Sequence, residues 1–416
     1  MSIIRSNAIR IKRFRELKAD LRTRRDRLLV GIDVAKAQCV AQVQLAHTRV
    51  LERAVTLPNT TAGFTALWRR LQRHQVATRC GEIVCALEPT GTYHQALAQF
   101  LDAQGADVVL VAPQVAHANR STLDGTWDKN DPKDAANLCD LLERGRVLFY
   151  SVPDEPLASL RRVAHCLRRA RVELAASKAR WQNTLRPALA PTGTSLPADL
   201  IRALPAPVVA LLADADCERR RGRPPRPASL PPGFTADLAD LAARLTGVRA
   251  RIRALEAAAV RLAAALPAYA LLLSLPGVGR TVAALLVAEI GDIGWYTKFS
   301  QLRKLAGLDI VRLQSGRFAG QPRISKCGRP LLRWALYQAA VAVCRNPAWR
   351  ARRAALIAKR HGDPHAFFKA TIELAAKLLR LVWGVWRSGR PYDPTVGRAG
   401  VLAWDRRRQL RKHQRG

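Results

Sequence analysis

The sequence predicts an α/β N-terminal domain with a mixed five-stranded sheet, two long helices after it, and a mostly α-helical C-terminal domain. Three observations support this prediction. Short apolar runs alternate with helix-like stretches over residues 28–150, Arg- and Ala-rich helical periodicity begins after Pro153, and an apolar, helix-rich sequence follows Tyr269. Alternating strands and helices are typical of an α/β sheet, whereas sustained 3.6-residue periodicity indicates long helices.

Five apolar runs in the N-terminal part have the length and composition of buried strands. The first ends in an acid, the next two follow closely as a meander, and helices separate the last two. The expected strands are 28–33, 39–46, 49–57, 82–88 and 106–111. We assign this α/β domain to residues 28–150, after a basic arm at 1–27.

Two helical stretches, at 157–185 and 238–266, are predicted to form the arms of a helical coiled-coil hairpin within residues 151–266. Between them, 187–235 carries a run of Arg and Pro around Arg219 to Pro227, which opposes regular structure. We expect a loop there that faces a polyanion. The C-terminal domain is assigned to 267–392, and a basic tail to 393–416.

The charge balance predicts a polyanionic partner. The chain has 69 Lys and Arg against 32 Asp and Glu, which leaves a net charge of +37. Because Lys and Arg neutralise phosphates, DNA or RNA is the first partner to consider. A genomic bias would explain the preference for Arg over Lys, but not the excess of cations.

Several other classes of protein are disfavoured. The eight cysteines form no Cys-x-x-Cys pair, so a zinc site is poorly supported and reduced thiols are expected. The first 27 residues lack the apolar core of a secretory signal. Prolines and glycines interrupt the uncharged stretch 262–279, which argues against a transmembrane helix. We expect a cytoplasmic protein with no membrane partner.

Four acids are candidate ligands of a divalent metal. Asp33 and Glu88 each end an apolar strand, and two adjacent carboxylates with little water are costly unless a cation neutralises them. Asp131 and Asp134 are one helical turn apart and can face the same point. Four such oxygen donors suit two Mg²⁺ ions about 4 Å apart. Each acid alone also fits a structural role: a strand-end turn for Asp33, a surface position for Glu88, and an N-cap and first-turn acid for the other two.

The stretch 273–292 has the pattern of a helix-hairpin-helix motif. The turn Pro276-Gly277-Val278-Gly279 joins an apolar helix end to an Ala- and Leu-rich helix. Glycines allow close backbone approach, and the N–H groups at the start of the second helix can hold a nucleic-acid phosphate. The neighbouring Arg280 favours this interpretation, although an ordinary tight turn between helices has the same spacing.

Ser315 is a candidate nucleophile. It precedes Gly316 in a polar loop, and four cations follow it in the sequence, which would stabilise a phosphorane-like charge. A serine hydroxyl needs a base or metal, and no His lies close in sequence. A simple Ser-Gly turn is the alternative. The four cations are Arg317, Arg323, Lys326 and Arg333.

Six motifs give the chain a family resemblance. They are GIDVAK (31–36), EPTGTYH (88–94), NDPKDAANL (130–138), NTLRPAL (183–189), LPGVGRTVAALLVAEIGD (275–292) and SGRFAGQPRISKCGRPLLRWALY (315–337). On these motifs the chain resembles the DEDD transposases of insertion sequences, which act as bridge-RNA-guided recombinases. The resemblance covers about residues 28–392.

The resemblance implies a ribonuclease H-like N-terminal domain and a C-terminal domain that supplies the nucleophile. By motif match, the acids that bind Mg²⁺ or Mn²⁺, as two ions, are Asp33, Glu88, Asp131 and Asp134. Ser315 matches the serine that becomes joined to DNA as a phosphoserine. The resemblance further implies donor and target DNA, a non-coding guide RNA, and a dimer or tetramer whose active sites combine two protomers.

The sequence departs from the family pattern in places, and two other functions stay open. Asp128 adds an acid to the spacing of Asp131 and Asp134, and Cys327 and Arg329 replace residues of the family signature. A ribonuclease H-like or junction-resolving nuclease would use water and need only the acids. A non-catalytic nucleic-acid-packaging protein would need only the basic surface.

Overall fold

The computed structural model describes residues 7–89, 91–125, 130–150, 155–189, 232–312, 314–315 and 318–394. The chain divides into two compact units between Val152 and Pro153. The elements of the N-terminal unit are α1 (Asn7–Asp20), β1 (Arg27–Val34), β2 (Gln38–Leu45), β3 (Arg49–Pro58), α2 (Thr61–Thr78), β4 (Glu82–Leu87), α3 (His94–Ala103), β5 (Asp107–Leu110), α4 (Pro113–Asp124), α5 (Asp131–Glu143) and β6 (Leu148–Phe149).

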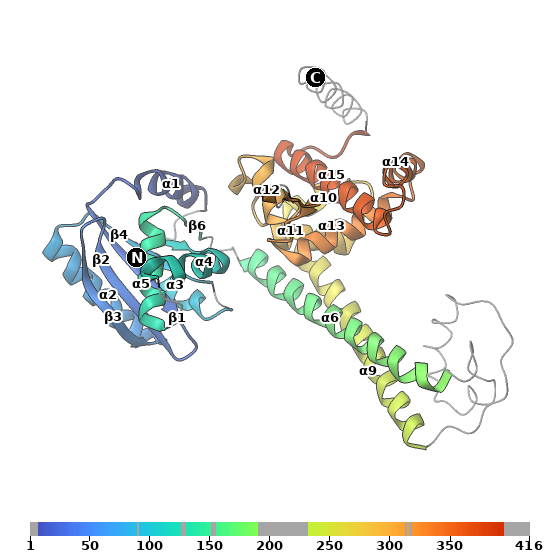
Figure 1. Ribbon diagram of the computed structural model, residues 1–416, viewed down its shortest axis with the longest axis horizontal. Helices are drawn as coiled ribbons and strands as arrows, with labels where there is room; N and C mark the ends of the chain where they lie inside the picture. The colour runs from blue at the N-terminus through green and yellow to red at the C-terminus, as the bar shows by residue number, and fades with distance from the viewer. Residues whose placement is uncertain are drawn as a thin grey trace. The chain divides into compact units, whose positions relative to one another are not determined.

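One mixed sheet forms the centre of the N-terminal unit (Figure 1). Its strand order is β3-β2-β1-β4-β5-β6, in which β1 pairs antiparallel with β2 and parallel with β4. The mixed sheet is confirmed, but the expected five strands are one too few. The sixth strand, Leu148–Phe149, pairs antiparallel with β5 and is too short for its residues to show a periodic pattern. The arrangement is compatible with a ribonuclease H-like fold.

The two faces of this sheet are covered by different helices. Along β1, the side chains of Leu28, Val30 and Ile32 join one core with residues of α2 and α3. Leu29 points to the other face, where residues of α1, α4 and α5 form a second core. Successive side chains of a strand point to opposite faces, so the alternation decides which helix each strand residue contacts.

The expected basic arm contains a helix that packs on the N-terminal unit. Leu17 of α1 and Leu21, which directly follows this helix, are buried in the core beneath α5. Arg10 forms an ion pair with Asp102. Arg13 likewise forms an ion pair with Asp107. These cations of α1 are therefore neutralised by acids of the same unit. Leu17 and Leu21 are spaced as on one helical face, a signal that the high Arg content obscures.

The C-terminal unit begins with two long helices and continues as a helical core. Its elements are α6 (Glu155–Leu189), α9 (Pro232–Ala264), α10 (Pro267–Leu273), α11 (Arg280–Ile290), the 3₁₀ helix η1 (Ile293–Trp295), α12 (Phe299–Leu305), β7 (Ile310–Val311), β8 (Gln314–Ser315), β9 (Phe318–Ala319), β10 (Arg323–Ile324), α13 (Pro330–Val343), α14 (Pro347–Ala358) and α15 (Ala366–Ser388).

The helices α6 and α9 lie side by side and run in opposite directions (Figure 1). Arg171 of α6 pairs with Glu256 of α9, whereas Glu173, two residues further along α6, pairs with Arg251. Both helices extend into the predicted irregular segment 187–235, since α6 ends at Leu189 and α9 begins at Pro232. The rest of that segment, 190–231 with its Arg- and Pro-rich run, lies outside the described residues.

Buried residues of α9 recur at alternating steps of four and three. Leu241, Leu245, Val248 and Ile252 follow this spacing, and all are buried. An average step of 3.5 residues keeps apolar side chains in a single stripe that faces a neighbouring helix. The stripe explains why a sequence rich in Arg and Ala forms a long helix pair.

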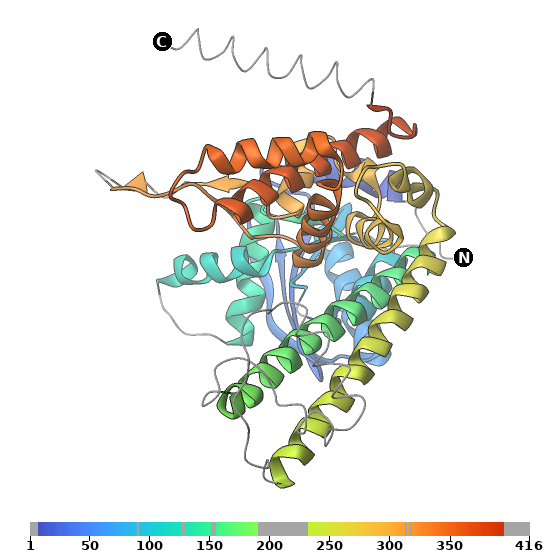
Figure 2. The same ribbon diagram turned by 90° about the vertical axis from the view of Figure 1, so that its right-hand side faces the viewer.

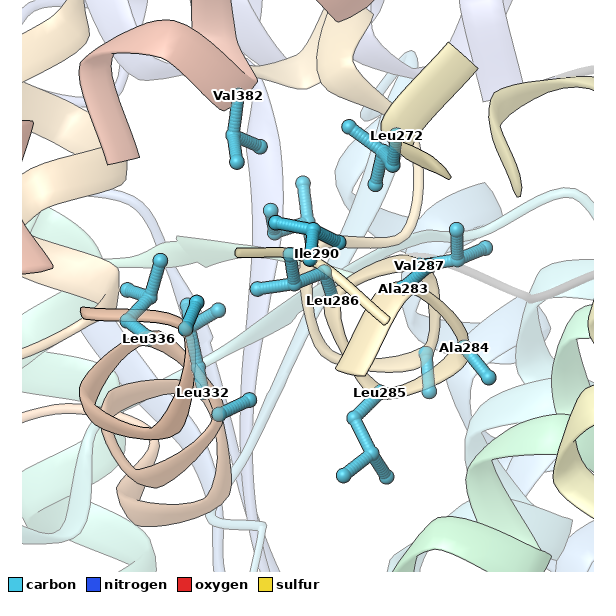
Figure 3. Packing of buried hydrophobic residues seen from close by; sticks show 14 of the residues in the cluster. Leu272, Ala283, Ala284, Leu285, Leu286, Val287, Ile290, Leu332, Leu336 and Val382 are labelled. Carbon is cyan, nitrogen blue, oxygen red and sulfur yellow. The ribbon is translucent and has the colours of Figure 1, made fainter. Parts of the chain in front are cut away.

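The core of the C-terminal unit surrounds α11 (Figure 3). Leu285, Leu286 and Ile290 of α11 are fully buried, and residues of α10, α13 and α15 lie around them. A helix that is apolar on all sides belongs inside a protein, as α11 does here. Within the described ranges, no single helix is long and apolar enough to cross a membrane. The helices 239–264 and 267–273 pass such a test only together, and they are bent by 112°.

Candidate active site and nucleic-acid interface

Asp33 and Glu88 lie at the same edge and on the same face of the sheet. Ile32 of β1 pairs with Leu87 of β4 in parallel, so the two acids follow at equivalent positions. The side chains of Ile32 and Leu87 belong to the core under α2 and α3. By alternation, both acids face the opposite side, which α5 covers. Both are half-buried.

Gly31 brings α5 onto this edge. A Cβ atom at position 31 would lie 2.2 Å from the carbonyl oxygen of Ala135 and 2.8 Å from the backbone nitrogen of Cys139. The backbone of α5 therefore rests directly on β1, which only glycine permits. The Gly31 N–H also donates to Cys139 Sγ at 3.1 Å. This contact fixes the first turn of α5 beside the end of β1.

The first turn of α5 presents Asp131 and Asp134 in different surroundings. Asp131 is exposed, and its Oδ2 accepts a hydrogen bond from Gln38 Nε2 at 3.5 Å. Asp134 is 6% exposed, and its Oδ1 accepts from Arg120 Nε of α4 at 2.5 Å. Gln38 begins the strand that pairs with the end of β1, so Asp131 lies at the same edge as Asp33.

The N-cap interpretation of Asp131 is wrong. The N-cap of α5 is Asn130, whose side-chain oxygen accepts from the Lys133 N–H at 2.9 Å. Asp131 and Pro132 then occupy the first two helical positions, and proline suits this place because it has no N–H group to satisfy. The other part of the structural interpretation is confirmed, because Asp131 and Asp134 are both acids of the first turn, where they stabilise the helix dipole. Asp128, the additional acid in the sequence, lies outside the described residues.

The donor chemistry of this edge fits a hard divalent cation. All four candidate ligands are carboxylates, which Mg²⁺ and Mn²⁺ prefer. Among the described residues, however, no three His, Cys, Asp or Glu side chains converge closely enough to hold a metal ion. The topology thus gathers the acids at one edge, while Arg120 and Gln38 interact with the two acids of α5.

Ser315 lies in an exposed β-hairpin of the C-terminal unit. β7 pairs with β10, and beyond them β8 pairs with β9 in the register Ser315↔Phe318. The hairpin projects away from the helices of its unit (Figure 2). The Ser315 side chain is exposed. No hydrogen bond links its hydroxyl to another of the residues that the structure places.

The cations predicted near Ser315 have separate roles. Arg323 is exposed in β10, and Lys326 is exposed just after it. Arg333 is half-buried instead, and its Nη1 donates to the carbonyl oxygen of Ala306 at 2.9 Å. Burial lowers the pKa of Arg333. Arg333 thus stabilises the turn before the hairpin, while Arg323 and Lys326 can meet a ligand. Arg317 is outside the described residues.

The two glycines of the turn between α10 and α11 have different functions. Gly277 has φ +77°, and a Cβ atom there would lie 2.6 Å from the carbonyl oxygen of Ala339 in α13. Gly279 is the N-cap of α11, and a Cβ atom there would meet nothing within 4 Å. Gly277 therefore seats the turn on α13, whereas Gly279 opens the start of α11 to a ligand.

An open groove of about 400 Å³ adjoins this turn. Besides the turn 276–279, its lining includes Arg345 and Asn346, which follow α13. Arg345 is exposed and lies at the groove. Sequence reasoning missed Arg345, as it missed Arg120 and Gln38, because each meets its site only through the tertiary fold. No local motif marks these positions.

Comparison with known proteins gives a consistent result for both units. A family model described as "Transposase" matches residues 30–192. A second model, described as "Transposase IS116/IS110/IS902 family", matches residues 269–355. The first match contains all four candidate acids, and the second contains the turn 276–279 and Ser315.

Three relatives are similar to the chain over different lengths. A transposase for insertion sequence element IS1328 of Yersinia enterocolitica is 24% identical over 88% of this chain and 98% of its own length. The uncharacterized 43.6-kDa protein of insertion element IS110 from Streptomyces coelicolor is 30% identical over 39% of each chain. The uncharacterized 44.8-kDa protein of IS116 from Streptomyces clavuligerus is 30% identical over 29% of this chain. The matched segments thus span 39% and 30% of the two Streptomyces proteins.

Proposed function

This chain belongs to the IS110 family of DEDD transposases of insertion sequences, and on that basis we propose that it cuts and exchanges DNA strands with divalent metal and a serine nucleophile. The observation that carries the proposal is the contact at Gly31. It places the acidic first turn of α5 at the edge and on the face where Asp33 and Glu88 end their strands.

The carboxylates at this edge would hold the metal. Asp33, Glu88, Asp131 and Asp134 supply only oxygen donors, and a divalent ion bound there would polarise a phosphodiester and stabilise its developing charge. Asp134 would exchange its bond to Arg120 for a bond to the ion. Arg120 neutralises this buried carboxylate in the structure, because an unpaired buried charge is costly.

Ser315 would provide the attacking oxygen. In the proposed step, its hydroxyl oxygen bonds to phosphorus, the bond from phosphorus to one deoxyribose oxygen breaks, and the departing oxygen takes up a proton. The resulting phosphoserine keeps the phosphodiester energy, so a second strand can reverse the step and be joined. The exposure of Ser315 at the hairpin supports this role, because the hydroxyl is open to a large substrate.

The C-terminal unit would also bind phosphates of the DNA backbone. We assign the turn between α10 and α11 as a helix-hairpin-helix, in which the open N-terminus of α11 and Arg280 bind a phosphate without reading sequence. Gly277 and Gly279 shape that turn, and Arg345 extends its cationic surface. Arg323 and Lys326 would hold phosphates beside Ser315.

The proposal includes an RNA partner and an oligomer. The resemblance implies a non-coding guide RNA that selects donor and target DNA, and the net charge of +37 suits two polyanions. The stripe of buried residues on α9 supports a coiled-coil hairpin formed by α6 and α9, which would join protomers as a dimer or tetramer. We propose that such a complex acts in the cytoplasm.

One observation favours a second function. All four acids lie in the N-terminal unit, which forms a compact body with its own cores, whereas Ser315 belongs to the other unit. A nuclease that activates water would need only the acids. This alternative predicts cleavage without any protein–DNA adduct.

A covalent-trapping experiment tests both functions. The full chain is incubated with Mg²⁺, with labelled DNA from the end of the insertion sequence, and with the proposed non-coding guide RNA. Covalent protein–DNA adducts are then separated under denaturing conditions. We expect an adduct from the wild type and from Ser300→Ala, which alters an exposed serine of α12. We expect none from Ser315→Ala or Asp33→Asn. Cleavage that persists in Ser315→Ala would favour the nuclease, and activity in all variants would reject both functions.

A further inference from the structure

Two exposed aromatic side chains at the start of α15 gather with a half-buried one on α13. The rings of Tyr337 and Phe368 stack at 6.1 Å between centroids with an angle of 19°. Phe367 meets Phe368 edge to face, and Val341 lies one turn from Tyr337 on α13. Phe368 is 59% exposed, Phe367 44% and Val341 40%. We call these four residues the aromatic patch.

A cation lies against this patch. The guanidinium carbon of Arg353 in α14 is 4.8 Å from the centroid of the Phe367 ring. Arg353 forms no ion pair with any carboxylate that the structure describes. A guanidinium over a ring, with its charge unmatched, can attract a phosphate while the neighbouring ring faces remain open.

The segment 347–388, which carries Phe367 and Phe368 of the patch, is strongly basic. Only two acids occur between residues 347 and 388, and both are paired, Asp363 with Lys369 and Glu373 with Arg360. Cations greatly outnumber them. The cations of this segment are Arg350, Arg352, Arg353, Lys359, Arg360, Lys369, Lys377, Arg380 and Arg387.

We propose that the aromatic patch is a stacking platform for unpaired bases of a single-stranded nucleic acid. Flat apolar rings beside the unmatched guanidinium of Arg353, in a segment with a large excess of cations, fit a ligand that carries flat bases on an anionic backbone. A second copy of this chain would bring the same excess of positive charge. A duplex would offer no free base faces. The platform goes beyond strand cleavage, because it needs neither the acids of the N-terminal unit nor Ser315.

A binding titration tests the platform. The full chain, with EDTA present to exclude cleavage, is titrated with 12-nucleotide single strands of DNA and of RNA that contain 2-aminopurine, whose fluorescence falls when it stacks. Phe368→Leu removes the ring but keeps an apolar side chain, and Phe368→Trp keeps a ring. We expect Phe368→Leu to weaken binding about tenfold and to lose the quenching, and Phe368→Trp to retain both.

An abasic strand of equal length is the matched ligand. It keeps the phosphates and lacks the bases, so Phe368→Leu should leave its affinity unchanged. Val172→Ala, an exposed apolar position on α6, should change neither ligand's affinity. Equal weakening of both strands, or no weakening of either, would overturn the platform. A fall in oligomer mass for Phe368→Leu with unchanged strand affinity would assign the patch to self-association instead. The DNA and RNA arms show which strand it prefers.

Discussion

The acids of the N-terminal unit and Ser315 of the C-terminal unit are held in opposite ways. Asp33 lies near the end of the buried strand β1 and Glu88 directly follows β4. Gly31 allows α5 to pack directly against β1, so the acidic first turn of α5 has a fixed place. Ser315 lies in a two-residue strand of an exposed hairpin. Repelling carboxylates need a rigid scaffold to stay together. In the proposed function Ser315 is the nucleophile, and exposure would help it to reach a phosphorus atom in a large substrate.

The largest effect should come from disturbing the rigid contact between β1 and α5. Gly31→Ala places a methyl group 2.2 Å from the Ala135 carbonyl oxygen, so α5 must move away from β1. We expect the free energy of unfolding to fall by about 3 kcal/mol. Displacement of Asp131 and Asp134 should reduce strand transfer at least about 100-fold. Chemical denaturation and a transposition assay measure the two effects.

Gly81→Ala is the matched control, because a Cβ atom at Gly81 would meet nothing within 4 Å. Stability and transposition should both stay near the wild-type values. If Gly31→Ala matched this control in both assays, the tight contact with α5 would not be what positions the acids.

The second effect concerns the turn between α10 and α11. Gly277→Ser should lower the free energy of unfolding by about 2 kcal/mol, because residue 277 has a positive φ and touches α13. Gly279→Ser should preserve stability, since serine is a good N-cap and the site is open. Its hydroxyl would occupy N–H groups of α11 that a phosphate needs, and DNA affinity should fall several-fold. Denaturation and filter binding distinguish the variants, and equal behaviour would contradict separate roles.

The contrast also shows what a single sequence can predict. The ends of β1 and β4 could be predicted to within one residue, because the apolar runs stop at Asp33 and Glu88. The strands themselves end at Val34 and Leu87. The mixed sheet and the long helices followed from the same periodicities. Gly31 was visible as part of a motif, but its contact with Ala135 was not, since that contact joins residues about 100 positions apart.

Other features could not be read from the sequence for definite physical reasons. The strand β6 has two residues, too few for an alternation. The true N-cap of α5, Asn130, directly precedes Asp131, and both residue types are good caps, so composition did not decide between them. Arg120 reaches Asp134 from another helix, and long-range ion pairs leave no local pattern.

A third, smaller effect should come from Arg120→Gln. Asp134 is buried and loses its cation, so we expect the free energy of unfolding in EDTA to fall by about 1–2 kcal/mol. Mg²⁺ should then raise the Tm of this variant more than that of the wild type, because the ion replaces the missing charge. Thermal unfolding with and without Mg²⁺ measures the difference. Arg144→Gln, which alters the more exposed pair with Asp140, is the control. An equal rise in Tm with Mg²⁺ for Arg120→Gln and the wild type would show that Arg120 and the metal do not neutralise the same carboxylate.

The smallest effect should appear in thiol reactivity, which reports how far a cysteine in each unit is shielded from solvent. Burial, and secondarily the charge of Asp33, raises the pKa of Cys39 to about 11, so only about one thiol in a thousand is ionised at pH 8. Cys327, at the base of the hairpin, is exposed. We expect iodoacetamide at pH 8 to label Cys327 well before Cys39, with no measurable change in Tm.

The raised pKa makes Cys39 stabilise the fold below pH about 9 and lose that contribution toward pH 11, where its labelling should begin. Peptide mapping by mass spectrometry follows both sites, and early labelling of Cys39 would show that the edge of the sheet beside Asp33 is open rather than enclosed.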